Sequence, residues 1–385
     1  MRAYIFAYRF FNYEAKRPNL GGTQTYITEL SELLYTQGYN VHVLDEKKGK
    51  CDKPRNDAFN HFTVEEFYYN HSLNKAFHKY YKTHTDKQTL FIIGDDEQNI
   101  FPKGIKNLIS IQHGVGWDYE RTTGKKSWDF IFPIFKLITC IRKVWKYYQG
   151  SNYVCVDYNY FNWLRTLYYI PKDRYLNVIP NFSSSQLNIQ DVKNKLDNLD
   201  SLQSSKIIFA RRLQWYRGSI IWANVVKRLS MEYPNLIFTI AGEGPCELEV
   251  RTILEGIPNV EFAKFTAETS VDFHKDFNIA VVPTIYSEGT SLSACEAMAA
   301  GCLPVVSYVG GLSNIVIDRF NGRSFFPSEE ELYKTIKEVL EMDILEYKRM
   351  VLRAFESTST SFSRRVWTDK WISVINYVMQ PNDIS

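Results

Sequence analysis

The sequence lacks the features that mark several common classes of protein. Its six cysteines are scattered and form no Cys-x-x-Cys pair, which disfavours a zinc site and a disulfide framework and predicts a reducing, cytoplasmic setting. It has no uncharged apolar run of about 18 residues, so no segment is expected to span a membrane. The apolar start, MRAYIFAYRFF, is too short for a signal peptide and predicts a first buried strand.

A strong charge of either sign is absent as well. The formal net charge is +3 over 385 residues, and no tract alternates basic and aromatic residues, so nucleic-acid binding is not expected. The charge is unevenly distributed, because residues 1–180 carry 25 Lys and Arg against 18 Asp and Glu. The first half is therefore the one expected to face an anionic surface or acceptor.

The length exceeds that of a single compact core, so about two domains are expected. Short apolar strand-like runs alternate with helical patterns in residues 1–182 and again in 206–361, which predicts an α/β protein with two tandem doubly wound domains. The polar stretch 183–205 is interpreted as a linker. Residues 362–380 have helical periodicity and are a candidate for packing back onto the first domain.

The segment 130–148 has an apolar stripe at helical spacing with lysines opposite. The stripe is formed by Ile134, Leu137, Ile138, Ile141, Val144 and Tyr148, and the opposite face by Lys136, Lys143 and Lys146. One interpretation is a helix that faces the protein core. The other is a helix that lies in a membrane interface, favoured by the basic face and the abundant aromatic residues.

The motif IAGEGP (240–245) ends a predicted strand with Gly242 and Gly244 at alternate positions, which would let the backbone approach a ligand closely. It is not the Gly-x-Gly-x-x-Gly fingerprint, because Cys246 and Glu247 follow. A nicotinamide-dependent dehydrogenase is therefore disfavoured.

Basic residues follow another predicted strand, in FARRLQWYRG (209–218). Arg211, Arg212 and Arg217 stand where a ligand of a doubly wound sheet would lie. Since arginines bind phosphate oxygens in bidentate fashion, they are candidates for a diphosphate site. The alternative is a solvated basic loop.

The stretch SEGTSLSACEAMAAG (287–301) predicts a loop and then a helix that begins near Thr290 or Ser291 and ends at Gly301. The free amides of its first turn, with Gly289 and the neighbouring hydroxyls, would form an anion site. Glu288 and Glu296 flank this site, and carboxylates accept hydrogen bonds from neutral sugar hydroxyls. One long ligand, such as a nucleotide-sugar, fits this pattern; the alternative is two ordinary acidic residues.

The extended run SEGTSLSACEAMAAGCLPVVSYVGG resembles the Glu-x7-Glu region of the retaining glycosyltransferases of family 4, which have the GT-B fold. Four further motifs resemble that family in the expected order: LGGTQTYITELSELLYTQGYNVHVL, VIPNF, RRLQWYRG and IAGEGP. The resemblance implies two Rossmann-like domains that face each other across a cleft. The first would bind the acceptor, and the second the nucleotide-sugar donor.

For the second domain, the resemblance implies that Arg212 and Arg217 bind the donor diphosphate and that Glu296 binds the ribose hydroxyls. Glu288 would bind the hydroxyls of the transferred sugar, assisted by the backbone from Gly289 through Thr290 to Ser291. Gly242 and Gly244 would also line the donor site.

For the first domain, the resemblance implies that His113 approaches the transferred sugar. Gly21 and Gly22 would let the first loop come close to the diphosphate.

The sequence departs from the family pattern at four positions. Arg211 stands where glycine is usual, Arg217 replaces a usual lysine, Lys264 stands where glycine is common near the base, and Thr290 replaces a frequent phenylalanine. The resemblance therefore leaves the donor open.

The function implied is a metal-independent, retaining transfer of a hexose-type sugar, with no cofactor. The acceptor would be a lipid-linked or other cell-surface saccharide in bacterial polysaccharide or lipopolysaccharide synthesis, reached by a protein peripheral on the inner face of the cell membrane through residues 130–148. The cluster GDDEQ (94–98) is expected to cap a helix rather than bind a cation. The alternatives are a nucleotide-sugar epimerase or phosphorylase of the same fold, or a non-catalytic nucleotide-sugar-binding partner.

Overall fold

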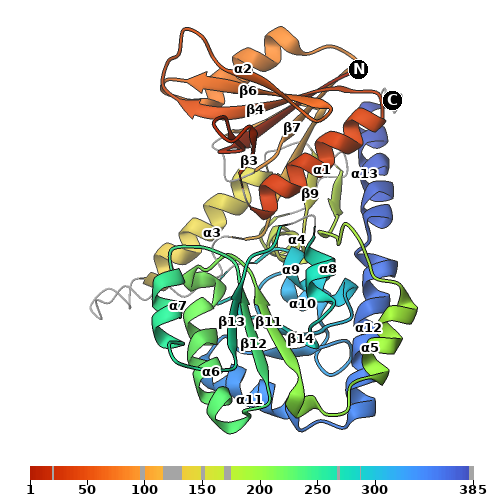
Figure 1. Ribbon diagram of the computed structural model, residues 1–385. Coiled ribbons are helices and arrows are strands. Elements are labelled where there is room, and N and C mark those ends of the chain that lie inside the picture. The colour runs from red at the N-terminus through yellow and green to blue at the C-terminus, as the bar shows by residue number, and fades with distance from the viewer. Residues whose placement is uncertain are drawn as a thin grey trace. The chain divides into compact units, whose positions relative to one another are not determined.

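The computed structural model describes residues 1–19, 21–95, 100–115, 132–148, 152–168, 175–266, 269–286 and 288–380. The chain divides into two compact units (Figure 1). The first unit holds the described residues of Met1–His113, Thr123–Ile179 and Thr368–Ser385. The second unit holds those of Gly114–Thr122 and Pro180–Trp367. The predicted pair of α/β units is thus confirmed.

The first unit is built on an eight-stranded sheet in the order β10-β9-β8-β7-β1-β4-β6-β5. All neighbouring strands are parallel except β5 and β6. The strands are β1 (Arg2–Tyr8), β4 (Asn40–Lys48), β5 (Asn56–Phe59), β6 (Phe62–Tyr69), β7 (Thr89–Ile93), β8 (Leu108–Gln112), β9 (Asn152–Cys155) and β10 (Leu176–Val178). The central strands β1, β7 and β8 are buried along their interior residues, as expected of parallel strands covered on both faces.

The remaining elements of this unit connect the strands. A small antiparallel ribbon pairs two short strands. The ribbon and helices are β2 (Phe11–Asn12), β3 (Arg17–Pro18), α1 (Gly22–Thr36), α2 (Leu73–His84), α3 (Phe132–Tyr148) and α4 (Tyr158–Leu167). The C-terminal helix α13 (Arg364–Met379) runs beside α1, where Trp371 Nε1 donates a hydrogen bond of 2.8 Å to Tyr26 Oη (Figure 1).

The second unit has a six-stranded, fully parallel sheet in the order β13-β12-β11-β14-β15-β16. The strands are β11 (Lys206–Ala210), β12 (Ile237–Ala241), β13 (Val260–Ala263), β14 (Ile279–Val282), β15 (Leu303–Ser307) and β16 (Arg323–Phe325). The strand order reverses between β11 and β14. In open sheets of this kind the crevice beyond the carboxyl ends of the strands at such a switch point is where ligands bind.

Helices cover both faces of this sheet (Figure 1). Alternate residues of β11 enter different cores, Ile207 and Phe209 on one face and Ile208 and Ala210 on the other. The helices are α5 (Ile189–Asp197), η2 (Leu202–Ser204), η3 (Trp215–Arg217), α6 (Ser219–Glu232), α7 (Glu247–Ile253), α8 (Ser270–His274), α9 (Leu292–Ala299), α10 (Leu312–Ile315), α11 (Glu329–Leu340) and α12 (Ile344–Ser361).

The stretch 183–205, expected as a linker, instead carries α5 and η2 and belongs to the second unit. Val192 and Leu196 are one helical turn apart and are both buried in its main core. A Cβ on Gly301 would lie 2.7 Å from Val192 Cγ1, so α5 packs closely against the end of α9. The stretch was expected as a linker because most of its residues are polar, and its buried face is formed by few apolar residues.

Helix α3 buries Val144 but leaves much of its apolar stripe exposed, which disagrees with the interpretation that the stripe faces the protein core. Val144 is fully buried and Cys140 nearly so. Four stripe residues are instead exposed, as are two further apolar side chains; the exposed fractions of Ile134, Phe135, Leu137, Ile138, Ile141 and Trp145 lie between 38% and 57%. The side chains of Lys146 and Tyr148 lie outside the described residues. Within the described part of the chain, no helix is long and apolar enough to cross a membrane.

Candidate functional site

The candidate site lies in the second unit, at the carboxyl ends of β11 and β14. Arg211 directly follows β11, while Thr284 and Glu288 belong to the loop after β14. Because these two strands are neighbours on either side of the switch point, their end loops meet. The sheet topology therefore brings residues more than 70 positions apart into one polar cluster.

Glu288 is held by three donors on a single carboxylate oxygen. Arg211 Nη2 donates to Glu288 Oε2 at 2.7 Å, and Thr284 Oγ1 donates to the same oxygen at 2.9 Å. Arg217 Nη1 also donates to this oxygen. Arg211 Nη1 in turn donates to Thr284 Oγ1 at 2.6 Å, which closes a ring of three side chains.

The charge state of Glu288 follows from these neighbours. Burial alone would raise the pKa of its carboxyl group, but the charges and hydrogen bonds of Arg211 and Arg217 outweigh burial and lower the pKa from 4.5 to about 2. Burial lowers the pKa of Arg211, and the neighbouring Glu288 offsets part of that effect. Glu288 is therefore ionised at neutral pH, so it accepts hydrogen bonds and has no proton to donate.

Two glycines missed at the sequence level shape the loop that carries Glu288. Gly310 has φ +53°, and a Cβ there would lie 2.0 Å from Glu288 O. The backbone N–H of Gly311 donates to Glu288 O at 2.8 Å. Their signal in the sequence is the pair of glycines after β15, in the segment VSYVGG.

Gly242 and Gly244 lie after β12, and the contact they allow is with the protein itself. A Cβ on Gly242 would lie 2.1 Å from Arg211 O, and one on Gly244 would lie 2.3 Å from Leu213 O. These glycines therefore let the chain after β12 pack against the chain that carries Arg211. The close backbone approach expected toward a ligand is used here for packing.

The start of α9 offers unpaired polar groups. Ser291 is the N-cap residue, is almost fully buried, and makes no side-chain cap bond. Its Oγ is buried with no hydrogen-bond partner among the described residues. Asn181 Nδ2, from the VIPNF motif, donates to Thr290 O and fixes the turn before the helix. Together with the first amides of α9, this is an environment suited to an anion.

Glu296 lies in α9, in a hydrogen-bond network separate from that of Glu288. Ser270 Oγ, from α8, donates to Glu296 Oε2 at 2.6 Å. Burial raises the pKa of Glu296 from 4.5 to about 7, which this one hydrogen bond only partly offsets. The two glutamates therefore have opposite pKa shifts, and Glu296 titrates near neutral pH.

The three arginines of the loop after β11 have different positions. Arg211 and Arg217 contact Glu288, whereas Arg212 is exposed and forms no ion pair with any described residue. Of the pair expected at the diphosphate, Arg217 is thus engaged with Glu288 and Arg212 faces solvent. Arg211 was a candidate for the diphosphate on its position after the strand and a departure from the family pattern, and the structure places it at the centre of the cluster around Glu288.

In the first unit, the residue expected to approach the transferred sugar is His113. His113 follows β8, and its Nε2 lies 2.8 Å from Gly94 O, so Nε2 carries the proton and Nδ1 is left as an acceptor. Burial lowers the pKa of His113. The edge of its ring meets Tyr26, with centroids 5.1 Å apart and the rings at 87°.

The two glycines of the first loop stand at the start of α1. Gly21 is its N-cap residue, and Gly22 its first helical residue. Of the acidic cluster at 94–98, Asp96, Glu97 and Gln98 lie outside the described residues. No group of residues suited to a metal ion occurs in the described part of the chain.

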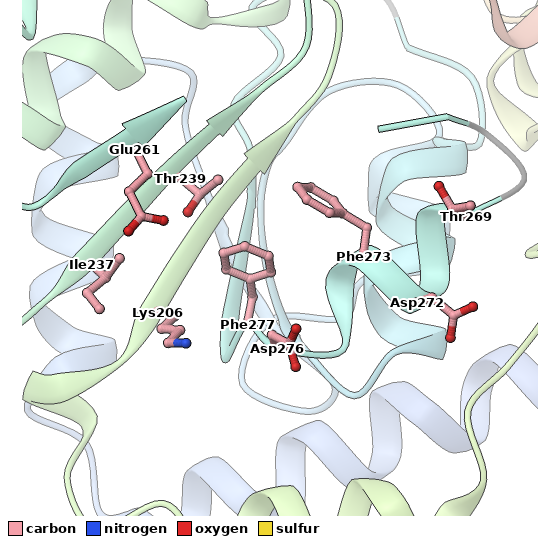
Figure 2. A pocket seen from close by; sticks show the side chains of 9 residues that line it. All are labelled: Lys206, Ile237, Thr239, Glu261, Thr269, Asp272, Phe273, Asp276 and Phe277. Carbon is pink, nitrogen blue, oxygen red and sulfur yellow. The ribbon is translucent and has the colours of Figure 1, made fainter. Parts of the chain in front are cut away.

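A separate hollow of about 450 Å³ lies on one face of the same sheet (Figure 2). Lys206 and Ile237, the first residues of β11 and β12, line it, so it lies toward the amino ends of the strands. Figure 2 shows Phe273 and Phe277 close to these strands. None of the residues expected from the sequence to form the site lines this hollow, which is therefore distinct from the candidate site.

Comparisons with known proteins were made for the sequence and for the fold. The sequence family described as "Glycosyl transferases group 1" matches residues 193–356, which include both β11 and β14. A glycosyltransferase of Methanocaldococcus jannaschii is 31% identical over 133 residues, 32% of this chain and 33% of the relative. Glycogen synthase of Thermodesulfovibrio yellowstonii is 29% identical over 150 residues, 38% of this chain and 30% of the relative. The chain thus spans about a third of the length of these relatives.

Solved structures resemble the whole chain. Sucrose-phosphate synthase from Thermosynechococcus elongatus has a TM-score of 0.70 at 16% identity, over 98% of each chain. An alpha,alpha-trehalose-phosphate synthase from Burkholderia vietnamiensis has a TM-score of 0.68 at 11% identity, over 100% of this chain and 98% of the other. At these identities the likeness concerns the fold. Residues 193–356 are thus similar to the glycosyl transferases group 1 family, and the chain has the two-domain α/β architecture of the GT-B fold.

Proposed function

We propose that the protein is a glycosyltransferase that moves a hexose-type sugar from a nucleoside-diphosphate sugar to an acceptor. The observation that carries the proposal is the ionised Glu288, held by Arg211 and Arg217 in the loop that leads into α9. A carboxylate that only accepts hydrogen bonds suits sugar hydroxyls, while arginines and free helix amides suit phosphates. A nucleoside-diphosphate sugar presents both kinds of group.

The roles along the donor follow this chemistry. Glu288 accepts hydrogen bonds from hydroxyls of the transferred sugar, and Glu296 from those of the ribose. Arg212 and Arg217 bind the diphosphate, together with backbone amides from Gly289 to Ser291. A related fold was solved with UDP-2-fluoro glucose, which supports testing UDP donors first.

The finer parts of the mechanism are retention of the anomeric configuration and independence from metal ions. Negative charge that develops on the leaving diphosphate would be stabilised by the arginines and the amides of α9, and preorganised groups of this kind are often the largest catalytic contribution. The acceptor would attack on the face from which the diphosphate departs, without a protein nucleophile. His113 is assigned to the transferred sugar, and Gly21 and Gly22 to the diphosphate, by resemblance alone.

A donor panel tests the activity. Purified protein is incubated with UDP-, GDP-, ADP- and dTDP-sugars together with a panel of saccharide acceptors, and release of nucleoside diphosphate is measured with and without EDTA. We expect one donor to raise the melting temperature, because a ligand that binds only the folded state stabilises that state. The same donor should be turned over at a rate that EDTA does not change. Glu288→Ala and Arg212→Ala are expected to lose turnover, whereas Arg349→Ala, an exposed arginine on α12, serves as the matched control.

Each outcome of this panel has a clear meaning. Equal rates for wild type, Glu288→Ala and Arg212→Ala would remove these residues from the reaction. Conversion of the sugar without transfer would indicate an epimerase, and binding without turnover would indicate a non-catalytic binding protein. The anomeric configuration of the product, read by NMR, tests retention.

We also propose a lipid-linked saccharide acceptor, of the kind used in bacterial polysaccharide or lipopolysaccharide synthesis, and a peripheral position at a membrane. Helix α3 carries Lys136, Arg142, Lys143 and Lys146 and no acidic residue. Its exposed face presents large apolar side chains, among them Leu137 and Ile138. A basic helix with an exposed apolar face suits an anionic lipid surface.

Vesicle flotation tests the membrane contact. Wild type is expected to float with phosphatidylglycerol vesicles and much less with phosphatidylcholine vesicles. Leu137→Asp with Ile138→Asp should abolish flotation, while Leu345→Asp, at a 63% exposed leucine on α12, should leave it unchanged. Flotation that survives the α3 changes would exclude this helix as the contact.

A further inference from the structure

Arg211 and Arg217 share Glu288 but differ in their access to a ligand. The side chain of Arg211 is 5% exposed, whereas that of Arg217 is 29% exposed. Arg211 follows β11 directly, and its backbone N–H donates to Ala241 O at 2.9 Å, so its main chain is tied to the sheet. Arg217 lies at the end of the short helix η3. Of these two arginines, Arg217 is therefore the one placed to reach a bound molecule.

The contacts of Arg211 fix the orientation of the carboxylate. Arg211 bonds both Thr284 and Glu288, and Thr284 also bonds Glu288, so all three side chains hold one another. Thr284 is itself anchored, because Ser307 Oγ donates to its carbonyl oxygen at 2.6 Å. The three donors converge on Glu288 Oε2, and no hydrogen bond to Oε1 occurs among the described residues. Oε1 is thus left for a ligand.

We infer that Arg211 is a positioning residue: it holds Glu288 ionised and oriented whether or not a donor is bound, so that Arg217 is free to move to the diphosphate. This inference rests on the proposed function and assigns the two arginines different tasks. A buried carboxylate with no arginine partner would take up a proton, because burial favours the neutral form. If Arg217 were the only partner, its transfer to the phosphate would leave Glu288 without its charge. Arg211 removes that conflict.

The test separates binding of the sugar from binding of the diphosphate. Affinities of UDP, GDP and ADP, and of their glucose conjugates, are measured by calorimetry for wild type, Arg211→Met and Arg217→Met. For the nucleotide that binds, Arg211→Met is expected to weaken the glucose conjugate about tenfold more than the nucleoside diphosphate, the effect of losing a hydrogen bond to a charged group. Arg217→Met is expected to weaken both ligands.

Two milder variants show whether a loss of affinity in Arg211→Met comes from the lost contacts or from misfolding. Thr284→Val removes one donor of the ring at nearly constant volume and should weaken the glucose conjugate in the same selective way, by a smaller factor. Arg211→Lys keeps the charge and should restore part of the loss. In the Glu288→Gln background, Arg211→Met should no longer change the preference for the glucose conjugate, because the group that it positions has lost its charge.

The outcomes distinguish this inference from the proposed function. If wild type binds none of the six ligands and no other sugar donor, the proposed function fails. If wild type binds a donor but Arg211→Met and Thr284→Val weaken diphosphate and conjugate equally, the assignment of Arg211 is overturned while the proposed function stands. Persistence of the Arg211→Met effect in the Glu288→Gln background would also overturn it.

Discussion

Replacement of Glu296 by glutamine is expected to stabilise the protein in a pH-dependent way. Glu296 is half-buried in α9 and has Ser270 Oγ as its hydrogen-bond partner, so its ionised form lacks the compensation that two arginines give Glu288. Glutamine has the same shape and still accepts a hydrogen bond from Ser270, but it carries no charge at any pH. The variant therefore isolates the cost of ionising this carboxyl group.

The size of the effect follows from the pKa of Glu296, which burial raises from 4.5 to about 7. One pKa unit corresponds to about 1.4 kcal/mol, so ionised Glu296 costs up to about 3 kcal/mol of folding free energy. Because the folded-state pKa is the higher one, wild type avoids this cost below pH 4.5, where Glu296 is protonated in both states. Its folding free energy then becomes less favourable as the pH rises toward 7 and beyond. Wild type and Glu296→Gln should therefore be equally stable at low pH and diverge above it.

Urea unfolding of both proteins at a series of pH values measures this difference. We expect the free energy of unfolding of Glu296→Gln to exceed that of wild type by up to about 3 kcal/mol at pH 8, with the difference growing through the range between the two pKa values. Ser270→Ala should enlarge the cost in wild type, since it removes the bond that favours the ionised form. A difference that is constant with pH would show that Glu296 is not buried as the structure has it.

Two further predictions concern the same site, and a third concerns the contact between α13 and α1 in the first unit. Gly310→Ala should destabilise the protein by more than about 2 kcal/mol in urea unfolding, because its Cβ would overlap Glu288 O at a positive φ; unchanged stability would contradict that geometry. Glu288→Gln should lower stability at neutral pH, and the loss should disappear as the pH falls from 4.5 toward 2; a loss that persists there would argue against the ion pair as its source. Trp371→Phe should cost about 1 kcal/mol in thermal unfolding, and the cost should vanish in a Tyr26→Phe background if their hydrogen bond is its origin.

The elements of the fold were largely predictable, because buried parallel strands appear as short apolar runs between amphipathic helices. The stretch 183–205 was the exception. Its core-facing residues Val192 and Leu196 are surrounded in the sequence by polar residues. The overall composition of the stretch is therefore polar and does not indicate that one face of the helix is buried. Periodicity likewise predicted α3 as a helix, but it does not say which face packs, and α3 buries Cys140 and Val144 rather than the broad stripe.

For the candidate site, residue types and strand ends were enough to select the loops but not the partners within them. Arg211, Arg212 and Arg217 looked alike in the sequence, since each follows the same strand. Their difference depends on the direction in which each side chain leaves the loop, and the loop backbone at Arg211 packs closely against Gly242 of a distant segment. Such contacts between distant segments leave no mark in the spacing of the arginines themselves.

Under the proposed function, the pKa values of the two glutamates would divide the pH dependence of donor binding between the two ends of the ligand. Glu288 stays ionised over the whole neutral range, so its contribution to binding a sugar should be constant there. Glu296 loses its charge below about pH 7, and a protonated carboxyl group is a weaker acceptor for ribose hydroxyls. The affinity for a nucleotide-sugar, whose diphosphate takes up no proton in this range, should therefore fall as the pH is lowered from about 8 to about 6, and Glu296→Gln should remove that dependence. Glu288→Gln should weaken the nucleotide-sugar by the same factor at both ends of this range, because Glu288 keeps its charge throughout it.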